Sequence, residues 1–443
     1  MKDERKHPSV LEVWLNQTRV GSITNLPYDR NLFVFDDEYV SHTKRAVLSL
    51  GFYDAGGGLI SRPQEVQTKV PPFFSNLLPE GRLREYLAER GGVNESREFP
   101  LLWLLGTDLS GALWVQDSEG RSLPPTDGGE GGASAGRPGS ESPLRFSLAG
   151  VQLKFSAVGQ PKHLSIPVEG RGGYWIVKLP SPRYPLIPEN EYSMMTLAKK
   201  TGISVADVGL IPVNQIEGLP AEFANDENNA LFVRRFDRTE DGKKIHIEDF
   251  NQLYGQFPDA KYKNFSYGNM AGDIWRVMGE QDLGEFVRRL VFNAAIGNHD
   301  MHLKNWSLTY ADGRTPRLSP GYDFVSTIRY IDDRKMALSI AREKDTKYLD
   351  IELLKSFAAR ARVPFRPLRE VALETAERTV KAWSETNVDL PLDSTMRHKI
   401  NEQLKYVPLT RLFLKESAQQ PRTSARQRGR RASKQRPQLN SKK

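Results

Sequence analysis

The chain has 443 residues, a formal net charge of +8 and no cysteine. Its length predicts about three domains or subdomains with substantial buried cores. The lack of cysteine excludes disulfide bonds, thiol catalysis and cysteine-ligated metal sites. No apolar stretch approaches the ~18 residues of a membrane span, and the first residues lack the apolar segment of a signal peptide. We therefore expect a cytoplasmic protein with no membrane partner.

Residues 1–116 predict a separate amino-terminal subdomain. Apolar residues at 13–15, 20–23 and 32–35 predict short β-strands, and residues 82–90 predict a helix that ends at a Gly-Gly pair. Residues 117–143 are rich in Gly, Pro and Ser, a composition that cannot form a packed core. We expect them to form a flexible insert between two folded parts.

Residues 144–240 contain features suited to holding a nucleotide. Small residues precede the alternation of Val151, Leu153 and Phe155, which predicts a loop opening into a strand, where backbone amides can approach phosphates. By pattern alone an ordinary turn before a strand is the commoner case, because neither common glycine-rich phosphate motif is present. A second predicted strand, residues 174–180, contains Lys178, which can point at phosphates or lie at the surface with its ammonium in water.

A helix is predicted over residues 192–200, preceded by the acidic residues Glu189 and Glu191 and closed by Gly202. One of these carboxylates can pair with Lys178, and we favour Glu191. Such a pair would reproduce the ion pair between a strand lysine and a helix glutamate that protein kinases require.

Residues 241–416 are expected to be mostly helical, and one polar loop within them carries the strongest indication of chemistry. An apolar stripe over residues 286–295 predicts a helix that stops at Gly297. Asp300 and Asn305 then follow with the spacing D-x-x-x-x-N, in which protein kinases use the Asp to accept a substrate hydroxyl proton and the Asn to hold magnesium. Asp323 supplies a second carboxylate downstream. Magnesium prefers such oxygen ligands, so Asn305 and Asp323 are the predicted metal residues.

This loop has two other interpretations. The loop could simply be a solvated connection after the helix, because such connections have a similar polar composition. A zinc site could use His299 and His302, but catalytic zinc needs three protein ligands and this spacing matches no common zinc motif. For His302 we favour a supporting role in the active site.

The basic charge of the chain belongs to its last segment. Residues 417–443 contain nine Lys or Arg and no acidic residue, which leaves a net charge of −1 for the rest. With Ser, Gln and Pro in the gaps, this tail is expected to be disordered. It could anchor nucleic acid through phosphate contacts, or simply keep the protein soluble. Both interpretations stay open.

Six sequence blocks, in order, carry a family resemblance. They are residues 76–81 (Asn-Leu-Leu-Pro-Glu-Gly), 104–112, 147–154 (Ser-Leu-Ala-Gly-Val-Gln-Leu-Lys), 177–180, 235–238 (Arg-Phe-Asp-Arg) and 297–305 (Gly-Asn-His-Asp-Met-His-Leu-Lys-Asn). Across roughly residues 10 to 330 the chain resembles the HipA toxin serine/threonine kinases of bacterial toxin–antitoxin modules.

The resemblance implies an α/β (α+β) fold: a two-subdomain protein-kinase-like fold with an additional amino-terminal HipA-type subdomain and a mostly helical carboxy-terminal part. It implies ATP and Mg²⁺ as cofactors, Asp300 as the base and Ser147 as an autophosphorylated residue. By the same analogy, the nucleotide would be covered by Ala149, Gly150, Val151, Gln152, Leu153 and Lys154. Phosphate and adenine would be held by Lys178, Arg234, Arg235 and Phe236, and the nucleotide and magnesium would be lined by His302, Leu303, Lys304, Asn305, Tyr322 and Asp323.

The function expected from this resemblance is transfer of the ATP γ-phosphate to a protein hydroxyl by a toxin. The implied target is a translation factor or an aminoacyl-tRNA synthetase. The implied partner is a helix-turn-helix antitoxin similar to HipB, with DNA contacted through that antitoxin or through the basic tail. Two alternatives stay open: a kinase-derived co-repressor that binds a DNA-binding partner without significant phosphotransfer, and a small-molecule phosphotransferase.

Overall fold

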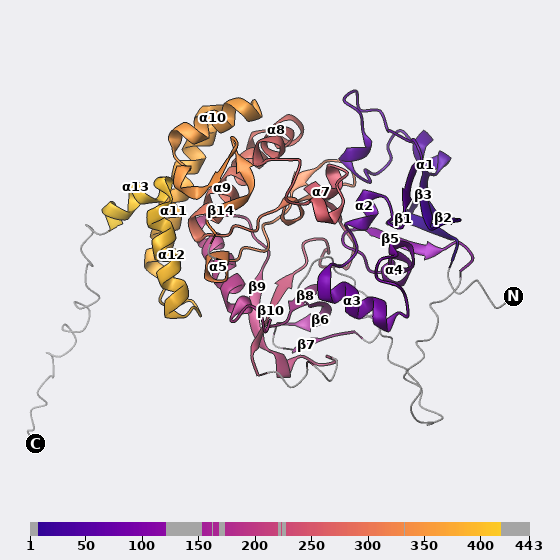
Figure 1. Ribbon diagram of the computed structural model, residues 1–443, viewed down its shortest axis with the longest axis horizontal. Coiled ribbons are helices and arrows are strands. Elements are labelled where there is room, and N and C mark those ends of the chain that lie inside the picture. The colour runs from indigo at the N-terminus through magenta and orange to yellow at the C-terminus, as the bar shows by residue number, and fades with distance from the viewer. Residues whose placement is uncertain are drawn as a thin grey trace, which may run out of the picture.

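The computed structural model describes residues 8–120, 153–161, 163–167, 173–219, 223, 227–331 and 333–417. In chain order, two five-stranded sheets are followed by a largely helical part (Figure 1). Predictions that concern Ser147, residues 149–152, most of the Gly/Pro/Ser-rich insert and the tail beyond residue 417 lie outside the described residues.

The first sheet is antiparallel, with strand order β4-β3-β2-β1-β5. The strands are β1 (Val10–Leu15), β2 (Thr18–Leu26), β3 (Arg30–Phe35), β4 (Gln64–Gln67) and β5 (Leu113–Asp117). Period-2 alternation decides which side chains enter the core: Leu11, Val13 and Leu15 are buried, whereas Trp14 stacks on Trp114 with ring centroids 5.3 Å apart.

Short helices cover this sheet and carry two of the blocks singled out in the sequence. They are α1 (Asp37–Ser41), α2 (Pro72–Ser75), α3 (Gly81–Arg90) and α4 (Glu98–Leu105), with the 3₁₀ turn η1 (Leu50–Phe52). The Asn-Leu-Leu-Pro-Glu-Gly block connects α2 to α3. The block at residues 104–112 connects α4 to β5.

The second sheet is also antiparallel, in the order β7-β6-β8-β10-β9. Its strands are β6 (Lys154–Gln160), β7 (His163–Ser165), β8 (Trp175–Lys178), β9 (Val208–Pro212) and β10 (Asn229–Arg234). One face contributes Phe155, Val177 and Ala230 to the same hydrophobic core as the amino-terminal sheet. The opposite face packs Leu231 and Val233 against α5 (Ile187–Thr201). The second sheet thus lies between two cores.

Helix α5 begins five residues before the predicted start. Pro188 stands in its first turn, where a missing backbone N–H costs nothing. The helix ends at Gly202, whose φ of 93° is the left-handed conformation that glycine adopts without strain.

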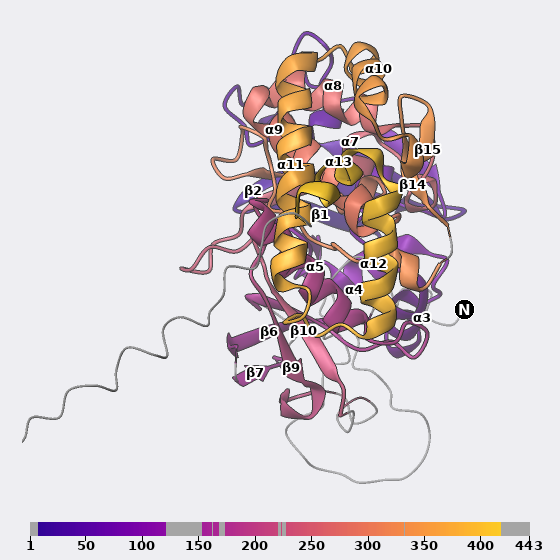
Figure 2. The same cartoon turned by 90° about the vertical axis from the view of Figure 1, so that its left-hand side faces the viewer.

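The third part is built around α9 (Glu280–Ile296), which packs against α8 (Tyr267–Met278), α11 (Phe365–Thr386) and α12 (Ser394–Tyr406) (Figure 2). The remaining helices are α7 (Phe250–Leu253), α10 (Ile351–Ala361) and α13 (Pro408–Ser417). Five strands interrupt this helical part: β11 (His246–Asp249), β12 (Ser307–Tyr310), β13 (Arg317–Leu318), β14 (Lys335–Ile340) and β15 (Glu343–Asp345).

A buried ion-pair network joins the amino-terminal domain to the second sheet. Arg238 donates to Asp108 at 3.1 Å and to the Gly111 carbonyl at 2.9 Å. Arg235 binds Asp237 through both ends of its guanidinium, at 2.9 and 2.8 Å. Although burial opposes it, the paired guanidiniums hold the pKa of Asp237 at about 2. Breaking such a network by removing one partner would leave uncompensated buried charge.

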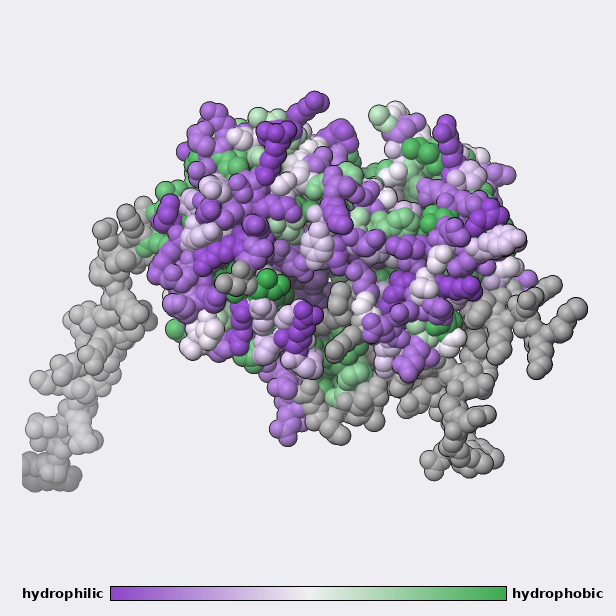
Figure 3. All heavy atoms as spheres, in the orientation of Figure 1, coloured by the Kyte–Doolittle hydropathy of each residue, from purple (hydrophilic) through white to green (hydrophobic). Residues whose placement is uncertain are grey.

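The surface in Figure 3 is mainly hydrophilic, with hydrophobic residues scattered over it. Among the described residues, no helix is long and apolar enough to cross a membrane.

Candidate active site

The polar loop of residues 297–305 is aimed by α9. That helix ends at Gly297, whose φ of 69° turns the chain sharply. A Cβ at this position would lie 2.6 Å from the Ile328 side chain, so only glycine fits. Asn298 then donates to Asn293 at 2.8 Å and to the Asp323 carbonyl at 3.1 Å. The loop and the Asp323 segment are therefore held together by one buried amide.

Asp300 lies on the exposed side of this loop, next to Asn305. The Asn305 amide donates to the Asp300 backbone carbonyl at 3.0 Å. The Asp300 carboxylate accepts a hydrogen bond from the Tyr262 phenol at 2.6 Å. Partial burial of the carboxylate raises the pKa of Asp300 above its ordinary value, while the Tyr262 hydrogen bond and Lys261 oppose the rise. A carboxylate placed this way can take a proton from a hydroxyl.

Lys178 and two carboxylates form the buried centre of the site. The Lys178 ammonium donates to Glu191 at 2.7 Å, the partner that the sequence favoured, and it also pairs with Asp323. Burial raises the pKa of Asp323, but Lys178 and Lys154 outweigh that effect and lower it to about 2, so Asp323 is ionised. Asp323 has a left-handed backbone with a φ of 56°, which is uncommon outside glycine and typical of functional sites.

Lys154 lies opposite Lys178 in the pairing of β6 with β8. Burial and the nearby Lys178 and Lys304 lower the pKa of Lys154 to about 8, and Asp323 offsets only part of this. No hydrogen bond to the Lys154 ammonium is found among the described residues. A buried ammonium without such a partner, beside Lys178, is suited to binding an anion such as a polyphosphate.

Glu80, from the Asn-Leu-Leu-Pro-Glu-Gly block, reaches the polar loop of residues 297–305 from the amino-terminal domain. Its carboxylate accepts from Lys304 at 2.6 Å and from Lys261 at 2.8 Å. Burial would raise the pKa of Glu80, but the two lysines lower it to about 2. The same block is fastened further by Asn76, which donates to the Gln256 carbonyl at 2.8 Å.

The other predicted site residues differ in how their side chains are used. Arg234 packs its guanidinium over Tyr174 and Trp175, and Arg235 is committed to the buried network described above. Phe236 lies 5.6 Å from Tyr322 between ring centroids. Leu303 is fully buried, so it can line a site only through its backbone.

His302 is a buried member of the polar loop. Burial, reinforced by Lys261 and Lys304, lowers the pKa of His302 to about 3, so its ring is neutral at physiological pH. Its ring meets Tyr262 edge-on, with centroids 5.0 Å apart.

The residues present fit Mg²⁺ and a nucleotide. Asp323 is an ionised carboxylate, and Asn305 uses its amide nitrogen on the Asp300 carbonyl, which leaves its Oδ1 as a ligand. Oxygen atoms of this kind are what Mg²⁺ prefers, together with phosphate oxygens and water. Lys154 and Lys178 lie beside Asp323 and would face the phosphates.

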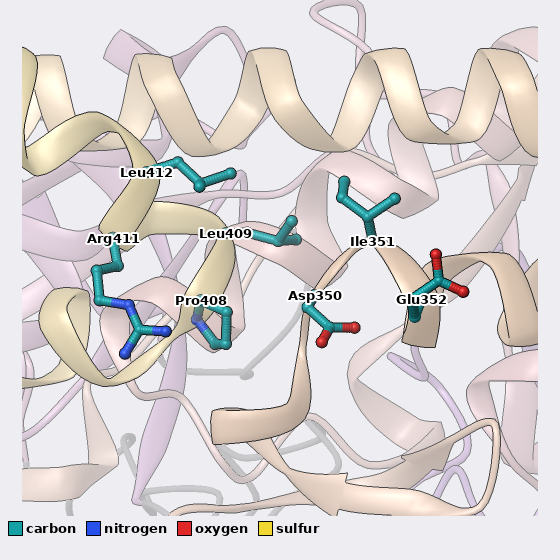
Figure 4. A pocket seen from close by; sticks show the side chains of 7 residues that line it. All are labelled: Asp350, Ile351, Glu352, Pro408, Leu409, Arg411 and Leu412. Atoms are coloured by element: carbon teal, nitrogen blue, oxygen red, sulfur yellow. The ribbon is translucent and has the colours of Figure 1, made fainter.

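A surface pocket of about 420 Å³ lies elsewhere, between the start of α10 and α13 (Figure 4). None of the predicted site residues lines it; its walls are Asp350, Ile351, Glu352, Pro408, Leu409, Arg411 and Leu412.

Two residues at the site were not singled out from the sequence. Tyr262 and Lys261 belong to a connection that carries no motif. Glu80 lay inside a quoted block but without an assigned role. Its position just before a glycine that opens a helix was the available signal, and nothing local indicates a partner 224 residues away.

The second sheet with its lysine, the helix with its glutamate, and the polar loop after α9 together define a protein-kinase-like fold. The family model for the HipA-like C-terminal domain matches residues 146–383, and that for the HipA N-terminal domain matches residues 11–116. The chain belongs to the HipA family, which confirms the resemblance inferred from the sequence blocks.

Similar proteins support this assignment. The chain is 46% identical over 415 residues to "Putative kinase Y4dM" of Sinorhizobium fredii, covering 92% of this chain and 99% of that protein. It is 28% identical to the serine/threonine-protein kinase toxin HipA of Shewanella oneidensis, over 73% of this chain and 78% of the toxin. The solved complex of Shewanella oneidensis HipA with HipB and operator DNA shares the fold, with a TM-score of 0.67, 24% identity and coverage of 91% of this chain and 97% of that one. The expected α/β kinase-like fold class is thereby confirmed.

Proposed function

We propose that this protein is an ATP-dependent serine/threonine protein kinase that acts as the toxin of a toxin–antitoxin module. The observation that carries the proposal is the convergence of Lys178, Glu191 and Asp323 beside the loop that holds Asp300 and Asn305. Kinase catalysis rests on positioning and charge stabilisation, and these are the residue types that it uses.

In the proposed reaction, Asp300 accepts the proton of the substrate hydroxyl as that oxygen attacks the γ-phosphorus of ATP. The bond between the γ-phosphorus and the bridging oxygen breaks, and ADP leaves. Asn305 and Asp323 would hold Mg²⁺, which would supply positive charge against the phosphates. Lys178 and Lys154 contribute positive charge at the same place, where a low-dielectric site strengthens their effect. Glu191 keeps Lys178 oriented, as the 2.7 Å ion pair indicates.

The finer parts of the proposal rest on family analogy. By that analogy the substrate is a translation-related protein such as an aminoacyl-tRNA synthetase, and Ser147 is autophosphorylated. Shewanella oneidensis HipA was solved together with HipB and its operator DNA. We propose a HipB-like helix-turn-helix antitoxin as the partner here, with DNA contacted through it or through the basic tail. Co-purification of this protein with a co-expressed HipB-like protein would test that partner.

The activity is tested by the intact mass of the protein after incubation with Mg·ATP, followed by peptide mapping. Wild type should gain one phosphate, on Ser147. Asp300→Asn should gain none, with an unchanged melting temperature, because the substitution keeps volume and removes mainly basicity. Ser147→Ala should stay unmodified at that position. Asp259→Asn is the matched control, because Asp259 is an exposed aspartate of a neighbouring segment.

Phosphate transfer by Asp300→Asn at the wild-type rate would refute Asp300 as the base. Absence of any transfer by wild type, to itself or to candidate target proteins, would favour the co-repressor instead.

A further inference from the structure

The hydroxyl of Tyr262 is hydrogen-bonded to the proposed catalytic base, Asp300. It donates to Oδ1 of Asp300 at 2.6 Å. A substrate hydroxyl must make this same hydrogen bond to a general base before it can lose its proton. In this structure the acceptor oxygen of the proposed base is therefore occupied by a hydroxyl group of the protein itself, in place of a substrate hydroxyl.

Several contacts hold Tyr262 in this place. The backbone N–H of Leu303 donates to the Lys261 carbonyl at 3.2 Å, which ties the segment to the catalytic loop. The Lys261 ammonium is anchored on Glu80 at 2.8 Å. The ring of Tyr262 rests edge-on against His302. Burial of the phenol and the neighbouring Asp300 charge raise the pKa of Tyr262, so the phenol stays protonated and remains the donor.

The side chain of Tyr262 can also rotate away from Asp300. Its side chain is not part of a core: the residue is 42% exposed and is one of the large hydrophobic residues left at the surface. It follows the short 3₁₀ turn η3 (Pro258–Ala260). Rotation of its side chain away from Asp300 would uncover the carboxylate without opening either hydrophobic core. The main loss would be a single hydrogen bond.

We propose that Tyr262 fills the acceptor-hydroxyl subsite and must be displaced by the substrate. This inference rests on the proposed kinase function and adds how access to its base is controlled. A serine or threonine side chain takes the place of the phenol on Asp300. Water competes for the same place, so Tyr262 also protects bound ATP from hydrolysis. A protein acceptor has further contacts with which to displace Tyr262, whereas water has none.

If Tyr262 only supported Asp300, removing its hydroxyl would change the rate of ATP hydrolysis in the opposite direction. If its hydrogen bond merely oriented Asp300, removing the hydroxyl would lower every Asp300-dependent rate. If the phenol competes with acceptors, removing it raises the rate with the smallest acceptor, water. Disruption of the site cannot imitate such a gain.

The test is steady-state hydrolysis of Mg·ATP by the full-length protein without protein acceptor, comparing wild type, Tyr262→Phe, Tyr262→Ala and Asp300→Asn. Tyr28→Phe is the matched control, because Tyr28 is 88% exposed in the turn between β2 and β3. Loss of one hydrogen bond to a carboxylate predicts a rise in hydrolysis of about ten- to a hundredfold in Tyr262→Phe. Tyr262→Ala should rise at least as much, the KM for ATP should be unchanged, and Tyr28→Phe should match wild type.

Melting temperatures establish that each variant is folded. Unchanged or slower hydrolysis in both Tyr262 variants, with Asp300→Asn inactive, would overturn this inference and leave the proposed function standing. Hydrolysis that is undiminished in Asp300→Asn, or undetectable in wild type and in both Tyr262 variants, would overturn the proposed function and the inference together.

Discussion

Replacing Glu80 by Gln should weaken the attachment of the amino-terminal domain to the catalytic loop. Glu80 pairs with Lys304 and Lys261, its side chain is 18% exposed, and its pKa lies at about 2 instead of 4.5. A difference of that size corresponds to about 3 kcal/mol of folded-state stabilisation by the charged carboxylate. Because the folded pKa is lowered, this stabilisation is present above about pH 4.5 and is lost as the pH falls towards 2. Glutamine keeps the shape and loses the charge, so we expect Glu80→Gln to cost about 2–3 kcal/mol at pH 7.

The assay is urea unfolding of wild type and variants at pH 7 and at pH 3.5. Asp259→Asn is the matched control, since Asp259 also pairs across the same two domains, with Lys69 at 3.5 Å, but is 76% exposed. Removing such an exposed pair should change stability by no more than about 0.5 kcal/mol. The deficit of Glu80→Gln should shrink at pH 3.5, because this pH lies below the ordinary pKa of 4.5 and the unfolded wild-type chain takes up a proton on Glu80 while the folded protein does not. Equal deficits in the two variants at pH 7, or a Glu80→Gln deficit that does not shrink at low pH, would refute the reasoning.

Two further predictions concern a buried acid and the tail. Burial raises the pKa of Glu248 to about 7, although Ser49 and Tyr310 donate hydrogen bonds to it. Its stabilising contribution is therefore present below about pH 4.5 and is lost as the pH rises through 7. In urea unfolding, the free energy of unfolding of wild type should fall by up to about 3 kcal/mol relative to Glu248→Gln between pH 4.5 and 8. A difference between the two proteins that does not change with pH would contradict this. Deleting residues 418–443, which hold all nine basic residues of the tail, should weaken DNA binding and flatten its salt dependence while ATP turnover stays unchanged. An unchanged salt slope would leave the tail a solubilising role only.

Local patterns in the sequence predicted the elements whose cause is local. The apolar stripe before Gly297 predicted α9, because 3.6-residue periodicity and a glycine stop are both readable along the chain. Short apolar segments predicted the first strands in the same way. The pairing of Lys178 with Glu191 was accessible because a strand and the next helix in a kinase-like order leave few candidate carboxylates.

The contacts between distant segments could not be predicted from the sequence. Glu80 meets Lys304 only because α2 packs against α7, and no periodicity in the sequence indicates that contact. Arg235 shows the converse problem. The family resemblance implied a role in nucleotide binding for Arg235, whereas its guanidinium is bonded to Asp237 in a buried network that also reaches Asp108 of the amino-terminal domain. A conspicuous basic residue therefore does not reveal which partner will neutralise it.

The shared core of the two sheets bears on how such a protein can be divided. The two family models match separate parts of the chain, residues 11–116 and 146–383, which suggests two independent domains. Yet Phe155, Val177 and Ala230 complete a core whose other half comes from the amino-terminal sheet. Excising either segment would bare an apolar face, the kind of surface that aggregates in water. Swapping amino-terminal domains between relatives should therefore give a folded protein only when the facing strands β6, β8 and β10 are exchanged with them. The two surfaces of this interface must change together.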